Sequence, residues 1–163
     1  MKGTGIFTGR DMVEMAVQTE ENGYRFYSAA AEKAASAKAA ELLKWLAEQE
    51  KEHERVFRTM LAEPERHEPA EEYAGQKAEF MQAILEARLL PDVETGEKKL
   101  AQMTSDDEVL EFALGFEKDT ILFMYEMREI VSPQSRETVD KLIAQEMGHV
   151  AKLVELRTQL RQD

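Results

Sequence analysis

Cysteine is absent from the 163 residues of this chain. Its absence excludes disulfides, thiolate zinc fingers, cysteine-bound iron–sulfur clusters and rubredoxin-type iron from the chain itself. Any redox chemistry must therefore take its electrons from another molecule. The sequence also has no apolar run of the roughly eighteen residues that a membrane helix needs, and its first residues show no export signal. We therefore expect a cytoplasmic protein with no membrane partner.

Basic residues are comparatively few, because 21 lysines and arginines stand against 33 acidic residues and give a formal net charge of −12. Such a surface repels nucleic acids and anionic membranes, so we expect neither as a partner. Strand patterns are scarce as well, because apolar positions recur every three or four residues rather than every second one. The length suits one domain with a sizeable core. We expect a single all-α domain over residues 1–163.

Four long amphipathic helices account for most of the chain. The apolar pattern predicts one helix pair over residues 11–62, with helices of about 11–35 and 37–61, and a second pair over residues 105–162. Ser105 and Glu108 are interpreted as a capping box, and Ser132 followed by Pro133 as the start of the last helix. The connections within each pair are short, so each pair is expected to be an antiparallel hairpin.

The segment 63–104 joins the two pairs and is too long for a structureless loop. Inside it, a helical pattern runs from Pro69 to about Leu90. About 20 helical residues span ~30 Å, roughly the length of a bundle. The expected fold is therefore a four-helix bundle with a long crossover that contains an extra helix. The crossover also suggests a homodimer, in which its apolar residues Phe80, Met81 and Leu89 form a dimer face or swap between chains.

Each predicted helix pair carries the same polar residues in its apolar stripe. A lone acid stands in the first helix of each pair, and a Glu-x-x-His motif stands in the second. On a helix, residues i and i+3 share a face, so the Glu and His of each motif project together toward the bundle axis. This set is the ligand pattern of a two-metal site inside a four-helix bundle. The six residues are Glu20, Glu50, His53, Glu117, Glu146 and His149.

The charge of this set requires two divalent cations, and its repetition shows that the pattern did not arise by chance. Four buried carboxylates repel one another unless cations bind, and two divalent ions neutralise them. Carboxylate and imidazole ligands suit iron, and would also accept manganese or zinc. Six protein ligands leave open positions on two ions, where O₂ or a peroxide can bind. A single Glu-x-x-His motif in a charged helix is usually solvated, but repetition of the whole set in both halves indicates a built site.

Other polar residues near the set have weaker interpretations. His67 is interpreted as a solvated loop residue. Tyr27 follows Glu20 by two helical turns, and it either packs in the core or donates a hydrogen bond to a ligand carboxylate. Gln49 and Gln145 each precede a Glu of the set, but neighbouring residues point to different sides of a helix, so we assign them surface or interface roles.

The sequence around the six residues resembles the rubrerythrin-like branch of the ferritin-like superfamily. The resemblance rests on the stretches 20–27, 47–53, 116–119 and 145–149. It implies a ferritin-like four-helix bundle with a non-haem di-iron centre that reduces hydrogen peroxide, the six residues being its metal ligands and catalytic residues. Rubrerythrins proper add a rubredoxin domain, so this chain needs an external electron donor such as a rubredoxin-type protein. They also carry a further Glu where this chain has Thr120, which brings the site closer to bacterioferritin-like diiron proteins.

The leading hypothesis is a cytoplasmic di-iron peroxidase that acts in oxidative stress. Its substrate would be hydrogen peroxide or O₂, and its electrons would come from the external donor. One alternative is a ferroxidase that handles iron, and another is a hydroxylase or oxidase of an organic substrate. A bundle that holds zinc for a structural purpose is the remaining alternative.

Overall fold

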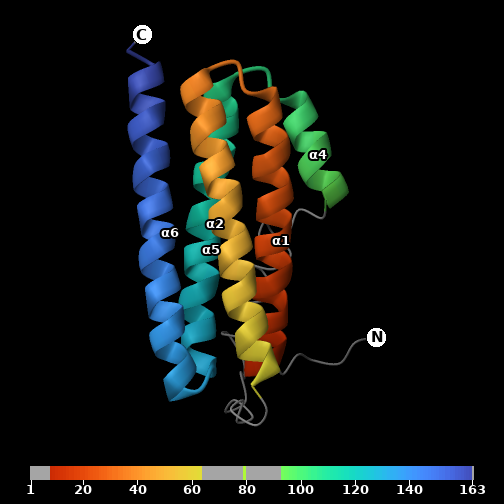
Figure 1. The fold of residues 1–163 in the computed structure, drawn as a ribbon, viewed down its shortest axis with the longest axis vertical. Helices are drawn as coiled ribbons and strands as arrows, with labels where there is room; N and C mark the ends of the chain where they lie inside the picture. Colours follow the sequence, from red (N-terminus) through yellow and green to blue (C-terminus); the bar gives the residue numbers. More distant parts are fainter. Residues whose placement is uncertain (1–7, 64–78, 80–92, 163) are drawn as a thin grey trace.

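The computed structural model describes residues 8–63, 79 and 93–162. Within these residues the chain forms five helices and no strand (Figure 1). The predicted all-α fold is confirmed, and the four long helices occupy the two predicted pairs. The helices are α1 (Gly9–Lys33), α2 (Ala37–Ala62), α4 (Val93–Gln102), α5 (Asp106–Ile130) and α6 (Pro133–Leu160).

The first helix begins earlier than its apolar pattern indicated. The hydroxyl of Thr8 accepts a hydrogen bond from the N–H of Asp11 at 3.1 Å, and the Asp11 carboxylate accepts from the N–H of Thr8 at 2.8 Å. This reciprocal capping box satisfies backbone donors that a helix start leaves unpaired. Asp11 is therefore the third residue of α1 and not the first, and the helix ends at Lys33, two residues before its predicted end.

The second pair begins at the predicted serines. The Ser105 hydroxyl accepts from the N–H of Glu108 at 3.3 Å, but the Glu108 carboxylate accepts from the N–H of Thr104, one residue before the partner that a capping box requires. The predicted box is thus only half formed. At the last helix, Ser132 is the N-cap and Pro133 the first helical residue, as predicted.

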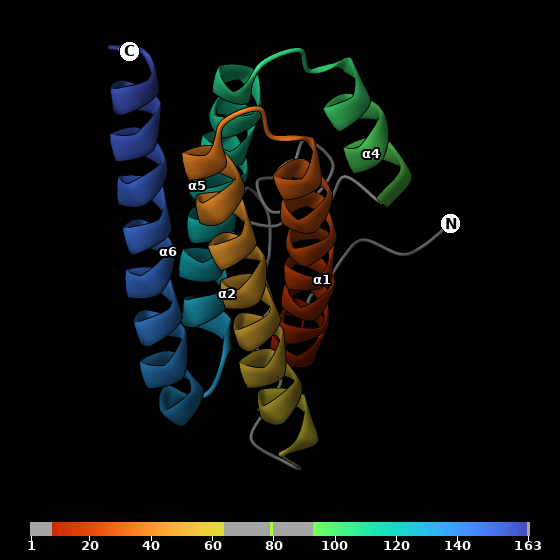
Figure 2. The ribbon, with the colours of Figure 1, turned by 45° about the horizontal axis from the view of Figure 1, so that its top comes forward.

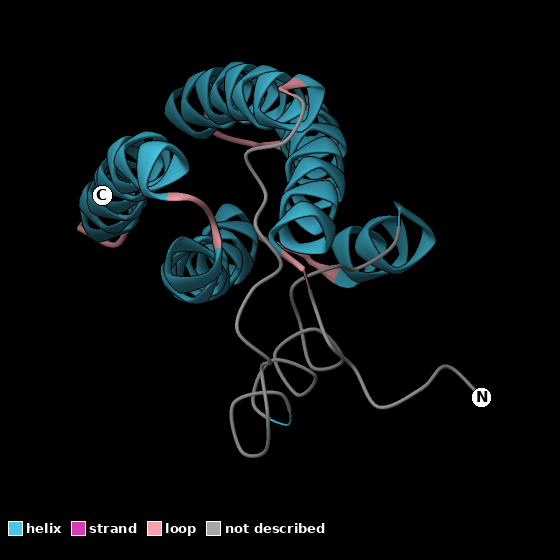
Figure 3. Ribbon diagram, turned by 90° about the horizontal axis from the view of Figure 1, so that it is seen from below, coloured by secondary structure: helices cyan, strands magenta, loops and turns pink. Residues whose placement is uncertain are grey.

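Seen along the bundle, α1 lies beside α2 and α5 lies beside α6, while the short helix α4 packs against α1 (Figures 2 and 3). The turn between α1 and α2 is tied to the other pair, because the Asp106 carboxylate accepts from the N–H of Ala35 at 3.0 Å and from that of Ser36 at 2.8 Å. Lys33 of α1 donates to the carbonyl of Leu100 in α4 and to that of Met103 just after α4. These bonds fix the two hairpins to each other at one end of the bundle.

Two apolar clusters fill the bundle, one toward each end. The first includes Phe57, Phe123 and Met124, and the second includes Leu46 and Leu110. In each of the four long helices, the residues between the two clusters include members of the predicted metal set. The polar centre is therefore closed on both sides by packed side chains. The apolar spacing of α2 favours Leu42 as a buried residue, but Leu43 is buried and Leu42 only partly so.

Helix α4 has no counterpart in the predicted elements. It lies after Pro91 in the crossover, and Leu100 is its buried anchor in the second apolar cluster. Of the helix predicted for residues 69–90, the structure describes only residue 79, whereas His67 and the predicted dimer face lie outside the described residues. Among the described helices, none combines the length and the apolar character required to cross a bilayer.

A charged contact at one end of α5 and α6 gives a first test of the fold. Asp107 accepts two hydrogen bonds from Arg157 and two from Arg161, with Nε to Oδ1 distances of 2.7 and 2.8 Å. These guanidinium groups hold the pKa of Asp107 well below its usual value. A depressed acid stabilises the fold above the ordinary pKa of ~3.9 and loses this effect as pH falls.

Asp107→Asn is expected to lower the free energy of unfolding by about 0.5–1 kcal/mol at pH 7, since the side chain is partly exposed and solvent screens the pair. Urea unfolding of both proteins between pH 7 and pH 2 measures this difference. The difference in free energy of unfolding between the two proteins should narrow as pH falls below about 5. A gap that stays constant down to pH 2 would contradict the assigned role of the carboxylate charge.

Candidate metal centre

The six predicted residues meet in the middle of the bundle. Glu20 comes from α1, one Glu and one His come from each of α2 and α6, and Glu117 comes from α5. None of them is more than 1% exposed. Taking so many ionisable groups out of water is costly unless they are paired or bind cations.

The ligand atoms form two overlapping groups. One group offers ligand atoms that all lie within 4.8 Å of one another and consists of Glu20, Glu50, His53 and Glu146. The second group meets the same criterion and consists of Glu50, Glu117, Glu146 and His149. The shared acids are Glu50 and Glu146.

The two histidines face the carboxylates through the same ring nitrogen. The Nδ1 atom of His53 lies 2.8 Å from Oε1 of Glu146 and 3.6 Å from Oε2 of Glu20. The Nδ1 atom of His149 lies 2.7 Å from Oε2 of Glu146 and 3.6 Å from Oε2 of Glu117. The rings stack with centroids 5.4 Å apart and planes inclined by 11°. Glu146 thus stands between the histidines and has one oxygen close to each.

Several buried polar atoms of the cluster lack hydrogen-bond partners within the described residues. They include both carboxylate oxygens of Glu20 and of Glu50, and Nε2 of His149. Buried polar groups are normally satisfied, and leaving a charged one unpaired is expensive. Carboxylate oxygens without donors around two shared acids fit a pair of cations, which would supply the missing partners. The buried hydroxyl of Thr120 also lacks a partner.

The acids and the histidines perturb one another strongly. Burial raises the pKa of Glu50 well above its usual value, and the charges of Glu20 and Glu146 act in the same direction. Burial and the charge of Glu146 raise the pKa of Glu117 to about 8. Burial alone would lower the pKa of His53, but its contacts with Glu146 and Glu20 outweigh this and raise it to about 11. The cluster therefore retains protons that bound cations would replace.

Glu146 is the exception among the acids. Burial would raise its pKa, but the contacts with His149 and His53 hold that pKa well below the ordinary value. The contacts with Glu117 and Glu146 likewise overcome burial at His149 and raise its pKa to about 9. Glu146 is thus the acid of the cluster that keeps its negative charge, and it lies between the two histidines.

Tyr27 donates a hydrogen bond to Oε1 of Glu117 at 2.5 Å. This confirms that the tyrosine bonds a carboxylate of the set, although the acceptor lies on α5 and is not Glu20 of its own helix. Burial and the charge of Glu117 raise the pKa of Tyr27 well above its usual value, so its hydroxyl keeps its proton. Tyr27 therefore orients Glu117 and leaves the other oxygen of that acid free to face the cluster.

Three contacts of the cluster were not predicted from the sequence. The Oε1 atom of Gln145 lies 2.9 Å from Nε2 of His53, the ring nitrogen on the side away from the carboxylates. The predicted surface or interface role of Gln145 therefore omitted this contact. Trp45 lies edge-on to His149, with ring centroids 5.3 Å apart. Gly23 leaves the room that the Glu50 side chain occupies, because a Cβ atom there would stand 2.3 Å from Oε2 of Glu50.

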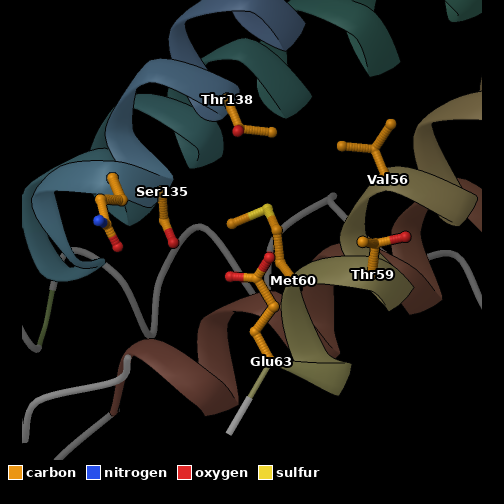
Figure 4. Close-up of a pocket in the computed structure, with 7 residues that line it drawn as sticks. Val56, Thr59, Met60, Glu63, Ser135 and Thr138 are labelled. Carbon is orange, nitrogen blue, oxygen red and sulfur yellow. The ribbon is translucent and has the colours of Figure 1, made fainter. Parts of the chain in front are cut away.

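A separate pocket lies between the end of α2 and the start of α6 (Figure 4). It has a volume of about 280 Å³ and is lined by residues that include Met60, Glu63 and Ser135. None of its described lining residues belongs to the six-residue cluster.

Comparison with known proteins agrees with the geometry. The family model of rubrerythrin matches residues 11–157, a range that contains all six clustered residues. No curated protein gives a match. Among solved structures, the chain is similar to a crystal structure described as a ferritin-like diiron-carboxylate protein from Thermotoga maritima, with a TM-score of 0.76 and 29% sequence identity. The similarity covers 94% of this chain and 96% of that chain.

Proposed function

Because the chain belongs to the rubrerythrin family, we propose that its buried cluster holds two iron ions and reduces hydrogen peroxide or O₂ with electrons from an external donor. One observation carries this proposal. Two groups of four ligand residues overlap in Glu50 and Glu146, which is the arrangement that two neighbouring ions require. The similar structure described as a diiron-carboxylate protein supports the same reading of the ligand set.

The residues divide between two positions. Glu20 and His53 would hold one ion, and Glu117 and His149 the other, while Glu50 and Glu146 would contact both. Four carboxylates balance two divalent ions, so the loaded cluster would be neutral within the apolar interior. Manganese or zinc would fit the same oxygen and nitrogen ligands, so iron is proposed on the strength of the family and of the redox chemistry.

When bound, a pair of iron ions supplies electrons and open positions for a small oxidant. The protein's own contribution is to orient the ligands and to exclude water. Tyr27 fixes Glu117 by its hydrogen bond, and the apolar clusters on both sides of the centre leave little room for a large organic substrate. This enclosure favours peroxide or O₂ over an organic compound.

The electron donor must be another molecule, because the chain contains no cysteine for a rubredoxin-type iron site. We propose a small one-electron protein, such as a rubredoxin-type donor. The acidic balance of the chain, with a net charge of −12, would favour a donor with a basic contact surface.

The experiment that tests this function begins with anaerobic Fe²⁺ titration of metal-free protein. Loaded protein is then mixed with H₂O₂ or with O₂ in a stopped-flow instrument, and the near-ultraviolet absorption of oxidised iron is followed. We expect two irons per chain and faster oxidation by peroxide. Failure to bind two irons would overturn the di-iron centre, whereas two irons with O₂ as the better oxidant would transfer the assignment to ferroxidase or oxygenase chemistry.

Ferroxidase activity is the second candidate, and Thr120 favours it. This buried position has a hydroxyl where rubrerythrins proper carry a further Glu, so the centre has six ligand residues. In ferroxidase chemistry, Fe²⁺ is both substrate and electron source, so no protein donor is needed. Repeated oxidation of added Fe²⁺ beyond two per chain, together with assembly into a large cage, would support this candidate against the peroxidase.

A further inference from the structure

The two histidines of the cluster differ on their outer side. Both ring nitrogens of His53 face oxygen atoms, because Nδ1 lies 2.8 Å from Oε1 of Glu146 and Nε2 lies 2.9 Å from Oε1 of Gln145. Only an N–H can bond each of these acceptors, so Nε2 of His53 carries a hydrogen that it donates to Gln145. This bond joins α2 to α6 from the side opposite the carboxylates.

The equivalent bond is missing in the other half of the repeat. Gln49 precedes Glu50 as Gln145 precedes Glu146, so a symmetric bundle would place Gln49 against His149. Instead, Nε2 of His149 has no hydrogen-bond partner within the described residues. The ring of Trp45 stands edge-on beside His149, at an interplanar angle of 84°. The sequence repeat is therefore not repeated in the contacts that support the two histidines.

We propose that Gln145 is a positioning residue that fixes the orientation and tautomer of His53, and so makes the His53 metal position tighter than the His149 position. This inference rests on the proposed di-iron function. A hydrogen bond at Nε2 keeps the proton on that nitrogen, so Nδ1 is the nitrogen that gives up its proton and offers its lone pair when a metal binds. The bond to Gln145 does not compete with a metal for Nδ1, so it persists when that nitrogen becomes a ligand.

The expected size of the effect follows from other metal sites. Removing a hydrogen-bond partner of a ligand histidine costs about 10–100-fold in metal affinity. Gln145→Leu keeps a side chain of similar length but removes the acceptor, so it should weaken one of the two metal positions by this factor. Gln145→Glu retains an acceptor oxygen and should restore binding. Gln49→Leu is the matched control, because Gln49 occupies the equivalent position of the other half without a hydrogen bond to either histidine.

The test uses Co²⁺ titration of the full metal-free chain, with visible absorption for affinity and proton NMR for the two histidine N–H signals of the loaded protein. Wild type should bind two ions with unequal affinity and show one N–H that exchanges slowly with water. In Gln145→Leu, that signal should exchange quickly and the tighter step should weaken, while Gln49→Leu should match wild type. If Gln145 only stabilised the fold, Gln145→Leu would not alter one histidine N–H signal and leave the other unchanged.

The outcomes separate this inference from the proposed function. Two Co²⁺ ions with identical affinities and exchange rates in wild type and Gln145→Leu would overturn the role of Gln145 and leave the metal centre intact. Equal weakening in Gln145→Leu and Gln49→Leu would also overturn it, because it would show a general effect of the substitution. Wild type that binds no metal would overturn the centre and this inference together. Two bound ions without peroxide or O₂ reduction would count against the proposed activity alone.

Discussion

Replacing Gly23 with alanine is expected to weaken metal binding about 10–100-fold while the helices stay folded. An ideal Cβ at this position would stand 2.3 Å from Oε2 of Glu50, 3.1 Å from its Cδ and 3.1 Å from Cε1 of Phe116. The Phe116 ring is buried and cannot move far. The Glu50 carboxylate must therefore leave its place, and Glu50 is one of the two acids common to both ligand groups.

Gly148→Ala is the matched control for this variant. Gly148 also lies in a long helix beside a residue of the cluster, but a Cβ there would meet nothing within 4 Å. Alanine should therefore stabilise α6 by about 0.5–1 kcal/mol through helix propensity and leave metal binding unchanged. Metal titration and thermal unfolding of both variants give the comparison. Two ions bound by Gly23→Ala with wild-type affinity would show that Glu50 does not need this space.

The repeat in the sequence was sufficient to predict which six polar residues meet inside the bundle, and the physical reason is helical periodicity. In Glu50-x-x-His53, the i and i+3 spacing decides that both side chains share a face, and the surrounding apolar residues decide that this face is buried. The spacing is the same whatever the neighbouring helices do. The lone acids Glu20 and Glu117 were placed by the same argument, since each interrupts an apolar stripe.

Contacts between helices were harder to predict, because they depend on rotations and offsets that periodicity does not specify. Gln145 was assigned to the surface on its own helix, yet its side chain reaches His53 on α2. The sequence likewise does not show that Glu50 fills the space beside Gly23, because this contact joins α1 to α2. The start of α1 was missed for a local reason. Thr8 and Asp11 form a capping box before the apolar pattern begins.

Glu50→Gln is expected to raise the stability of the metal-free protein and to remove most of the stabilisation by metal. Both oxygens of Glu50 are buried without a hydrogen-bond donor among the described residues, and burial raises its pKa well above the usual value. A buried acid with a raised pKa destabilises the fold above its ordinary pKa of ~4.3, and this effect disappears as pH falls. The neutral amide has a similar shape, so the free energy of unfolding at pH 7 should rise by about 1–3 kcal/mol.

Bound metal should make wild type more stable than Glu50→Gln. A ligand that binds only the folded state, at 100 times its dissociation constant, stabilises by about 2.7 kcal/mol, and this gain requires the acids that hold the ions. Glu50→Gln loses a carboxylate from both ligand groups, so wild type should become the more stable protein once Co²⁺ or Fe²⁺ is added. Urea unfolding with chelator and with metal measures both differences. Glu48→Gln, at an exposed position on the same helix, should change the free energy of unfolding by less than about 0.5 kcal/mol, both with chelator and with metal.

The pH dependence identifies the cause of any stabilisation in the metal-free protein. If the raised pKa of Glu50 is responsible, the advantage of Glu50→Gln should shrink as pH falls from 7 toward 4, because the destabilisation by such an acid fades as pH approaches its ordinary pKa. A constant advantage would indicate better packing of the amide instead. If metal-free Glu50→Gln is instead less stable than wild type, the protonated rings of His53 and His149 already neutralise the acids. The acids raise the pKa of both histidines, which favours this protonated form. Removing one negative charge would then leave a buried imidazolium unpaired, which costs more than the carboxylate did.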